Sequence, residues 1–223
     1  MMVGVLLAAG ASRRMGTPKA LVREKGLSLL AHGVRHLWTA CDAVVVVLGS
    51  NASLVRQRVE EEFQGLVGSG KLNQDLTKAH HHGSKGLEVR FVANRSWRSG
   101  MLSSVRTGLS EAIGLRPEGV VVLPVDCPSV RPTTVHDLAS LMQMAMKACR
   151  SPRERRLFAY ALVPRFRKDR GHPIALSPAL ARAVAMDRGA HDLSDAVRRN
   201  ARLLGYFDVV DPGVVRNRNR PGD

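Results

Sequence analysis

Short, unbroken apolar runs alternate along this chain with stretches in which apolar residues recur at helical spacing. The clearest run, Ala43–Leu48, holds four consecutive valines and suits a strand that is buried on both faces of a sheet. A stretch of helical spacing precedes it and runs through Leu30, Val34, Leu37 and Cys41. This alternation is typical of βαβ units, so the sequence predicts an α/β fold with helices packed on a mostly parallel sheet.

The apolar runs give the expected strands, which are Met2–Ala8, Ala43–Leu48, Leu87–Ala93, Gly119–Val125 and Leu157–Val163. A second helix is expected across residues 102–113, where apolar residues again recur on one helical face. Pro132 suits the first position of a third helix.

Two segments interrupt the alternation. Residues 65–86 are rich in Gly, Ser, Lys and His and have no apolar period, so we expect a long exposed loop. The basic segment 150–156 is expected to be a turn. From about Leu157 onward, we expect an α+β portion that shares the core of a single domain, residues 1–223.

The net charge is +15, from 34 Lys and Arg against 19 Asp and Glu, which favours anionic partners. Nucleic acid is not expected, because basic residues are spread over the chain and a 4% aromatic content offers few rings for stacking bases. A membrane is not expected, since no apolar stretch reaches the roughly 18 residues of a spanning helix. The chain has three cysteines, Cys41, Cys127 and Cys149, and none of them forms a C-x-x-C pair. This pattern favours a reduced, cytoplasmic location.

The most informative segment runs from Leu7 to Lys19 and has the sequence LAAGASRRMGTPK. Small residues let backbone N–H groups approach an anion, and the arginines and the lysine supply charge for phosphate oxygens. The segment suits a cradle for a nucleoside triphosphate, although it is neither a G-x-x-x-x-G-K-[ST] loop nor a G-x-G-x-x-G turn. By composition alone, a glycine-rich turn with surface arginines explains it equally well.

The order L-A-A-G-x-S-x-R-M-G-x-x-K resembles the signature of the MobA-like nucleotidyltransferases, and in particular the branch that contains molybdenum cofactor cytidylyltransferase. Later segments are similar to the pattern of the same family: Asn94 to Ser104 with Trp97 and Gly100, Leu123 to Pro128 around Asp126, and Arg170 to Ile174. The similarity is collinear from residue 3 to about 221.

This resemblance implies a Rossmann-like three-layer nucleotidyltransferase fold, in which residues 1–150 bind the nucleotide and residues 151–223 form the acceptor side. It implies transfer of a nucleoside monophosphate from a triphosphate to a phosphorylated acceptor, with release of pyrophosphate. The L-A-A-G form favours CTP over GTP. The favoured acceptor is molybdopterin or molybdenum cofactor, with a molybdoenzyme as a further partner; a sugar phosphate, an alditol phosphate or another small phosphate stays open.

The resemblance also implies roles for single residues. Lys19 and Arg14 are expected to contact phosphate oxygens in catalysis, and Asp126, at the end of a buried strand, to bind Mg²⁺. The acceptor is expected to contact Gly171, His172 and Pro173. Nucleotide contacts are expected from Leu7, Ala8, Ala9, Gly10, Ala11, Ser12, Arg14, Gly16, Lys19, Asn94, Ser103 and Ser104.

Taken without the resemblance, several of these residues have ordinary structural explanations. Asp126 suits a turn before Pro128. Ser103 and Ser104 suit helix capping as well as nucleotide binding. His172, a loop histidine before a proline, suits a structural role.

The C-terminus departs from the family pattern D-[IV]-D-T-P-x-D. Asn217 and Asn219 stand where relatives carry carboxylates. An amide oxygen is an uncharged and weaker ligand, so Asn219 is expected at most to assist Asp126 in binding Mg²⁺. Three explanations stay open: an enzyme that uses Asp126 with nucleotide phosphates and waters, a degenerate nucleotide-binding or cofactor-delivery protein, and a tail whose alignment carries little meaning.

Overall fold

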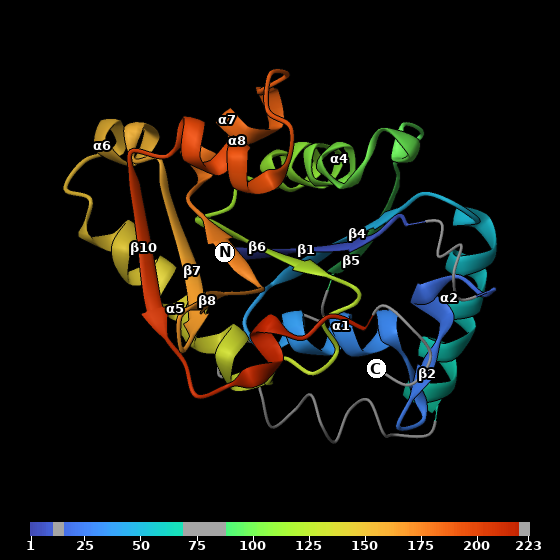
Figure 1. Cartoon of the computed structure of the whole chain (residues 1–223). Helices are drawn as coiled ribbons and strands as arrows, with labels where there is room; N and C mark the ends of the chain where they lie inside the picture. Colours follow the sequence, from blue (N-terminus) through green and yellow to red (C-terminus); the bar gives the residue numbers. More distant parts are fainter. Residues whose placement is uncertain (11–15, 69–87, 219–223) are drawn as a thin grey trace.

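The computed structural model describes residues 1–10, 16–68 and 88–218, and its centre is an 8-stranded sheet (Figure 1). In chain order, the strands of this sheet are β1 (Met2–Ala8), β4 (Ala43–Leu48), β5 (Glu88–Ala93), β6 (Gly119–Pro124), β7 (Tyr160–Phe166), β8 (Asp169–Arg170), β9 (Ile174–Leu176) and β10 (Leu203–Asp208). They lie in the order β10-β7-β9-β6-β1-β4-β5, and β8 pairs with β7. A separate hairpin is formed by β2 (Arg23–Glu24) and β3 (Leu27–Ser28).

Parallel pairing of the central strands brings their carboxyl ends to one edge of the sheet. β1 pairs in parallel with both β4 and β6, and β4 pairs in parallel with β5. Every residue of β1, β4 and β6 is buried, as expected for strands that are covered on both faces. β9 runs antiparallel to both β6 and β7 and so joins the strands of the C-terminal third to the parallel part.

Helices cover both faces of the sheet and make three layers (Figure 1). Alternate residues of β1 point to opposite layers, with Leu6 in one core cluster and Val5 in the other. The cluster of Leu6 includes residues from α1 (Leu29–Trp38), α2 (Ala52–Gly68) and α5 (Pro132–Ala148). The cluster of Val5 includes residues from α4 (Met101–Gly114), α7 (Pro178–Met186) and α8 (Leu193–Asn200). Shorter elements are α6 (Pro152–Leu157) and the 3-10 helices η1 (Lys19–Leu21), η2 (Trp97–Ser99) and η3 (Pro212–Val215).

Two glycines let helices approach β1 closely from opposite faces. A Cβ at Gly108 of α4 would lie 2.4 Å from Val5 Cγ1, and a Cβ at Gly33 of α1 would lie 2.5 Å from Leu6 Cδ1. Any side chain at these positions would push the helix away from the sheet. The two glycines therefore fix how near α1 and α4 lie to the central strand.

The predicted α/β fold with a mostly parallel central sheet is confirmed. The strands expected over residues 2–8 and 43–48 have the observed bounds, and β6 ends one residue earlier than expected, at Pro124. β5 ends at Ala93 as expected, and its expected first residue, Leu87, lies outside the described residues. Helix α5 begins at Pro132, as the proline predicts.

The region after residue 150 differs from expectation at two points. The segment 150–156, expected as a turn, contains helix α6, because Ser151 Oγ accepts a hydrogen bond from the N–H of Glu154 and caps the helix. The Glu154 carboxylate in turn accepts a hydrogen bond from the N–H of Arg150, an arrangement close to a capping box. The strand expected from Leu157 consequently begins at Tyr160.

Helix α2 continues to Gly68, so the first residues of the loop expected over 65–86 are helical. A single interior glycine such as Gly65 costs a helix only about 1 kcal/mol, which is too little to end it. Residues 69–86 of the expected loop lie outside the described residues. In the described part of the chain, no helix has the length and apolar character needed to cross a bilayer.

Candidate active site

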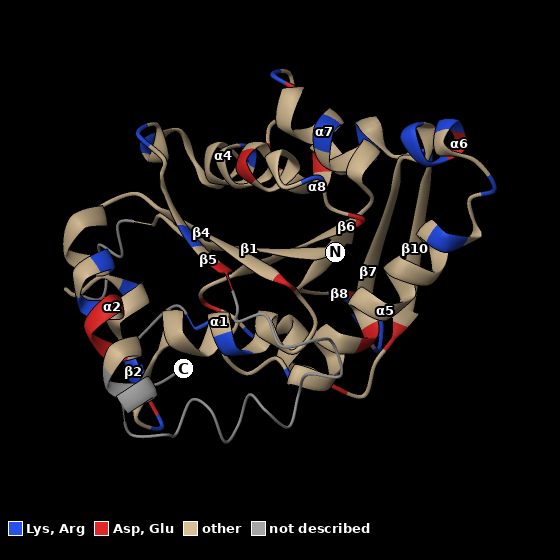
Figure 2. Cartoon of the chain, turned by 180° about the vertical axis from the view of Figure 1, so that it is seen from behind, with Lys and Arg blue, Asp and Glu red and all other residues tan. Residues whose placement is uncertain are grey.

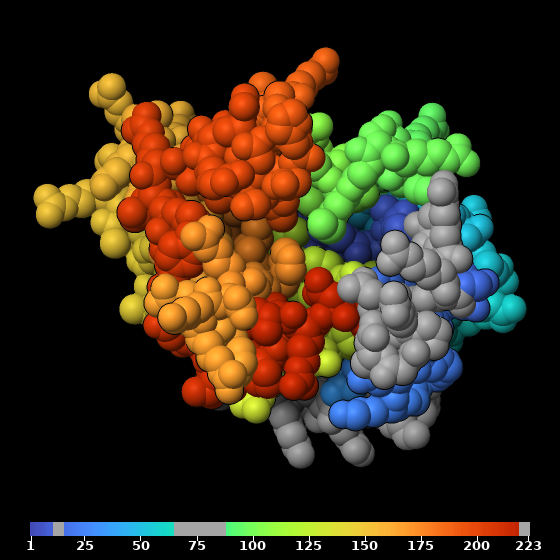
Figure 3. Space-filling model, in the orientation of Figure 1, coloured from blue at the N-terminus to red at the C-terminus, as the bar shows by residue number. Residues whose placement is uncertain are grey.

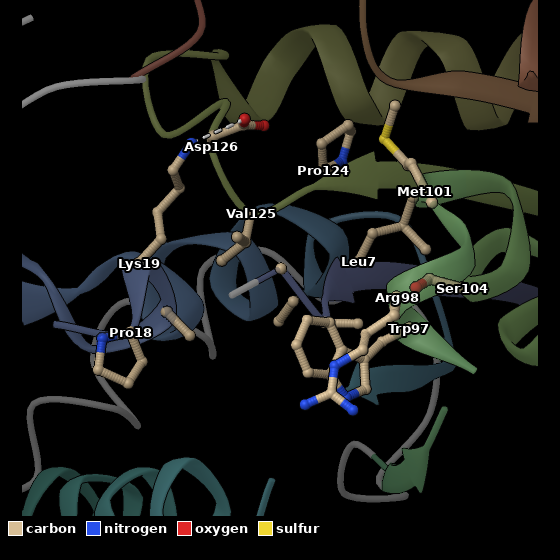
Figure 4. Close-up of a pocket in the computed structure, with 15 residues that line it drawn as sticks. Leu7, Pro18, Lys19, Trp97, Arg98, Met101, Ser104, Pro124, Val125 and Asp126 are labelled. Carbon is tan, nitrogen blue, oxygen red and sulfur yellow. Dashed lines mark hydrogen bonds and ion pairs between the residues drawn. The ribbon is translucent and has the colours of Figure 1, made fainter. Parts of the chain in front are cut away.

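A cavity of about 540 Å³ opens at the carboxyl ends of β1 and β6, the edge at which ligands of open α/β sheets bind. Figure 3 shows the surface hollowed between α4 and the C-terminal segment, which we define as residues 211–218. The cavity is lined by the end of β1, by η1, by η2 with the start of α4, and by the end of β6 (Figure 4).

Lys19 and Asp126 form an ion pair in this cavity (Figure 4). Lys19 Nζ lies 3.1 Å from Asp126 Oδ2, and the two side chains are 18% and 24% exposed. Asp126 follows the end of β6, where the N–H of Val125 donates to the carbonyl of Leu7 at 3.0 Å. Lys19 is the first residue of η1. The structure thus brings together the residue predicted to bind phosphate and the residue predicted to bind metal.

Another wall of the cavity is formed by η2 and the first turn of α4. Arg98 lies there, with its Cζ 4.9 Å from the centre of the Trp97 ring. Gly100, the N-cap of α4, has a φ of +99°, a conformation that glycine adopts without strain. Because Met101, the first residue of α4, also lines the cavity, the positive end of the helix dipole borders it. Sequence reasoning missed Arg98, although it lies inside the segment from Asn94 to Ser104 that resembles the family pattern.

A hydrogen-bonded cluster of Asn94, Ser103 and Ser104 lies beside the cavity. Asn94 Nδ2 donates to Ser103 Oγ at 2.8 Å and to Ser104 Oγ at 3.0 Å, while Asn94 Oδ1 accepts from the N–H of Ser96. Of the three clustered residues, Ser104 lines the cavity. Neither serine is the N-cap of α4, because Gly100 holds that position. The cluster fixes the end of β5 to α4 and positions Ser104 at the cavity wall.

The predicted nucleotide-binding segment falls in three parts. The cavity lining includes Leu7, Ala8, Ala9 and Gly10. The next predicted contacts lie outside the described residues: Ala11, Ser12 and Arg14. Gly16 is exposed, has a φ of +65° and does not line the cavity.

A second cavity, of about 430 Å³, adjoins the first, and Met101 lines both. Of the residues predicted on the acceptor side, Gly171 and His172 line this cavity and Pro173 does not. Its walls are mainly apolar and come from Val163, Ile174, Leu193, Val197 and Leu204. Sequence reasoning missed three charged and aromatic residues of this cavity, Asp192, Arg198 and Tyr206. It gave no role to Arg170, although Arg170 begins the segment that resembles the family pattern.

The second cavity disfavours the charged form of His172. Burial lowers the pKa of His172, and the negative charge of Asp126 opposes this effect only in part. Its Nδ1 is buried and has no hydrogen-bond partner among the described residues. Its backbone N–H donates to the carbonyl of Val214 at 2.8 Å, so the C-terminal segment supports the acceptor-side loop.

The C-terminal segment also reaches the turn that carries Asp126. The backbone N–H of Arg218 donates to the Asp126 carbonyl at 2.8 Å. Cys127 Sγ donates to Asn217 Oδ1 at 3.2 Å. Asn217, which the resemblance predicts at a carboxylate position of the family pattern, therefore lies directly against the Asp126 turn. Asn219 lies outside the described residues.

The donor set around Asp126 decides which kind of metal ion fits. In residues 1–10, 16–68 and 88–218, no three His, Cys, Asp or Glu side chains are grouped closely enough to hold an ion by themselves. Magnesium at nucleotide sites is commonly held by one or two carboxylates, with phosphate oxygens and waters as the other ligands. The residues present thus fit a divalent ion that arrives on a triphosphate, with Asp126 as its protein ligand.

Comparison with known proteins agrees with this geometry. Residues 4–203 match the family model of the MobA-like NTP transferase domain. Nicotine blue oxidoreductase of Paenarthrobacter nicotinovorans is 31% identical to the chain over 220 residues, which are 93% of this chain and 87% of that protein.

Solved structures share the fold. Rv0371c from Mycobacterium tuberculosis H37Rv has a TM-score of 0.68 at 21% identity, over 98% of this chain and 93% of that chain. A manganese complex of Rv0371c has a TM-score of 0.60 at 20% identity, over 93% and 88% of the two chains. A nucleotidyl transferase from Methanothermobacter thermautotroptrophicus has a TM-score of 0.61 at 19% identity, over 99% and 92%.

The structural likenesses support the three-layer fold, and the family model spans most of the sequence. The residues of the L-A-A-G segment, Lys19 and Asp126 lie within the matched range. The chain is therefore an enzyme of the MobA-like NTP transferase family.

Proposed function

We propose that the protein transfers a nucleoside monophosphate from CTP to a phosphorylated acceptor, molybdopterin or molybdenum cofactor, and releases pyrophosphate. The observation that carries the proposal is the Lys19–Asp126 pair, which lies at the carboxyl edge of the sheet in a cavity that adjoins a second one. A cation and a carboxylate within reach of one ligand suit a triphosphate together with its divalent ion.

The first cavity takes the triphosphate in this proposal. Lys19, Arg98 and the N-terminus of α4 supply positive charge at this cavity, which stabilises the charge that builds on the leaving pyrophosphate. Arg14, in the same segment as Lys19, is proposed as a further phosphate ligand. Asp126 holds Mg²⁺, an ion that neutralises phosphate charge when it is bound.

The second cavity takes the acceptor. Its apolar walls suit a flat ring system, and Arg170 and Arg198 provide charge for an anionic group. Because Met101 lines both cavities, the acceptor phosphate at their junction faces the α-phosphate of the nucleotide. An acceptor oxygen bonds to the α-phosphorus as the bond from that phosphorus to the bridging oxygen breaks, and pyrophosphate leaves with that oxygen.

The remaining assignments follow from the sequence. CTP is proposed as the donor because residues 7–10 have the L-A-A-G form. A cytoplasmic location is proposed, since Cys41, Cys127 and Cys149 are all free thiols. A molybdoenzyme is proposed to receive the product.

The test combines the purified protein with Mg²⁺, labelled CTP, GTP or ATP, and molybdopterin, and it measures both pyrophosphate and the dinucleotide product. We expect product with CTP and less with GTP. Asp126→Asn and Lys19→Met are each expected to lower the rate by about 100-fold or more. Lys147→Met, at an exposed lysine of α5, is the matched control and should leave the rate unchanged.

No turnover with any pair of nucleotide and acceptor would reject the proposed transfer. Nucleotide binding without turnover would instead identify a binding or delivery protein. Turnover with a sugar phosphate or an alditol phosphate in place of molybdopterin would keep the reaction and change the acceptor.

The relative that is 31% identical to the chain is named nicotine blue oxidoreductase. Its name favours a second candidate function, which is oxidoreduction. In this candidate, a reduced nicotinamide dinucleotide occupies the first cavity and a flat quinone-like compound the second. A hydride moves from the dinucleotide to the quinone, which gains a proton from solvent, and the oxidised dinucleotide leaves. Consumption of NADH or NADPH that requires a quinone-like dye would support this candidate, and no consumption would reject it.

A further inference from the structure

Two ion pairs of opposite polarity join residues 19–24 to two neighbouring parts of the chain, the turn that carries Asp126 and the C-terminal segment. The first joins Lys19 to Asp126 inside the cavity. The second joins Glu24, in the hairpin that follows η1, to Arg218 in the C-terminal segment. Residues 19–24 supply the cation of the first pair, Lys19, and the carboxylate of the second pair, Glu24.

Arg218 contacts both the hairpin and the turn that carries Asp126. Its guanidinium pairs with Glu24 Oε2, and each of these side chains is 23% exposed. Its backbone N–H donates to the Asp126 carbonyl at 2.8 Å. A single residue thus holds the hairpin through its side chain and the Asp126 turn through its backbone.

The hairpin transmits this contact because it is fixed to helix α1. The carbonyl of Glu24 accepts a hydrogen bond from His32 Nε2 of α1 at 2.7 Å. The N–H of Leu29, the first residue of α1, donates to the carbonyl of Val22 at 2.8 Å. Val22 lies between the hairpin and η1, which begins at Lys19. A shift of Glu24 relative to Asp126 therefore shifts Lys19 as well.

The C-terminal segment is also held by hydrogen bonds at its first residue, Asp211. Asp211 is 2% exposed, and its Oδ2 accepts hydrogen bonds from the N–H of Arg131 and from Thr134 Oγ1, both at 2.8 Å. These donors lie at the start of α5. Arg218 therefore contacts the hairpin from a segment that is itself held against a core helix.

We propose that Arg218 is a positioning residue whose pair with Glu24 sets the separation of Lys19 and Asp126. This inference rests on the proposed function in taking a triphosphate as the ligand. Lys19 and Asp126 line the cavity and exchange part of their mutual contact for phosphate and metal. Glu24 and Arg218 do not line it, so their pair stays intact and maintains the spacing of the two loops during that exchange.

The first test measures the position of Lys19 without any nucleotide. An amine-acylating reagent modifies the protein, and mass spectrometry gives the rate at Lys19 relative to that at Lys147, which is exposed. We expect a several-fold faster reaction at Lys19 in Arg218→Met and in Glu24→Gln, and an intermediate rate in Arg218→Lys. The control is Arg216→Met, at an exposed arginine of the same segment, which should match the wild type.

The second test measures the dissociation constant of CTP with Mg²⁺ by calorimetry. We expect an increase of about tenfold in Arg218→Met and in Glu24→Gln, because a small misplacement of positioned groups weakens every contact they make. The variant with both changes should be no weaker than either single variant, since each change breaks the same pair. A thermal melt of each variant checks that it is folded. If Arg218→Met does not fold, the acylation rate and the CTP affinity of Glu24→Gln decide the inference.

Wild-type values of Lys19 acylation and CTP affinity in Arg218→Met and Glu24→Gln would overturn the inference. So would additive losses in the double variant, which would mean that Arg218 and Glu24 act separately. If the wild-type protein binds no nucleotide, the proposed function fails by itself, and the Lys19 acylation rates then decide this inference alone.

Discussion

Lys19 and Asp126 form an ion pair in the cavity, and we expect this pair to oppose the binding of a metal ion at Asp126. A cation 3.1 Å from a carboxylate oxygen competes with a divalent ion for the same charge. We expect Lys19→Met to raise the affinity for Mn²⁺, added without nucleotide, by about tenfold, and Asp126→Asn to remove it. Electron paramagnetic resonance of free Mn²⁺ measures both. Equal Mn²⁺ affinity in the wild type and in Lys19→Met would contradict this competition.

His36 makes the stability of the protein depend on pH. Burial, helped by the neighbouring charges of His32 and Arg35 and opposed by Asp211, lowers the pKa of His36 from 6.5 to about 4. Between these values the unfolded chain binds a proton that the folded chain does not, so the free energy of unfolding falls as the pH drops from 6.5 to 4. The loss reaches about 3 kcal/mol.

Urea denaturation at a series of pH values measures this effect. His36→Leu removes the group, so its free energy of unfolding should fall less between pH 6.5 and 4 than that of the wild type. His136→Gln, at an exposed histidine of α5, is the matched control and should follow the wild type. A His36→Leu curve parallel to the wild-type curve would reject the assignment.

At the scale of elements, the contact between α4 and β1 links stability to the site. A methyl group at Gly108 meets Val5 Cγ1 at 2.4 Å, so Gly108→Ala is expected to cost about 1–3 kcal/mol of unfolding free energy. It should also weaken nucleotide binding, because α4 carries Met101 and Ser104 of the cavity wall. Gly114→Ala, at the other end of α4, meets nothing within 4 Å and is expected to be neutral or slightly stabilising. Equal unfolding free energies for the two variants, measured in urea, would contradict this packing argument.

The elements that the sequence predicts well are those that are buried along their whole length. β1 and β4 are buried along their whole length, so each is a continuous apolar run with clear ends. β9 has only three residues, which are too few to form a recognisable apolar pattern. Helix α6 depends on the cap from Ser151, and the basic composition of the segment does not indicate this cap.

The residues of the candidate site also differ in how well the sequence predicts them. Lys19 and Asp126 follow directly from segments that resemble a family pattern. Arg170 and Arg198 come from β8 and α8, which are separate in sequence, and line the same cavity only in the folded chain. The Glu24–Arg218 pair joins residues at opposite ends of the chain, and such a pair leaves no local signal in the sequence.

At the scale of the whole molecule, we propose that residues 1–223 form one domain. β9 pairs with β6, and α7 packs in the same core cluster as α4. We expect one cooperative transition in calorimetry, and a fragment of residues 1–150 that does not fold, because it would expose the edge of β6 and the face of α4. Two separate transitions, or a folded fragment, would contradict the proposal.

The net charge of +15 is also a property of the whole molecule. Figure 2 shows Lys and Arg on helices of both layers and on several loops. Among the described residues, the basic side chains that line the two cavities are Lys19, Arg98, Arg170 and Arg198. We therefore expect the overall charge to draw anionic ligands toward the molecule and the cavity residues to select among them.

The shared wall at Met101 has a consequence for turnover. Under the proposed function, the product is a single molecule whose halves occupy both cavities at once. When one half dissociates, the covalent link keeps it at high effective concentration beside its own cavity, and it rebinds before the other half leaves. Under the proposed function, we therefore expect the product to leave more slowly than either substrate and its release to limit the rate of the cycle. A partner that captures the exposed half during such a partial dissociation would accelerate the enzyme without touching its chemistry.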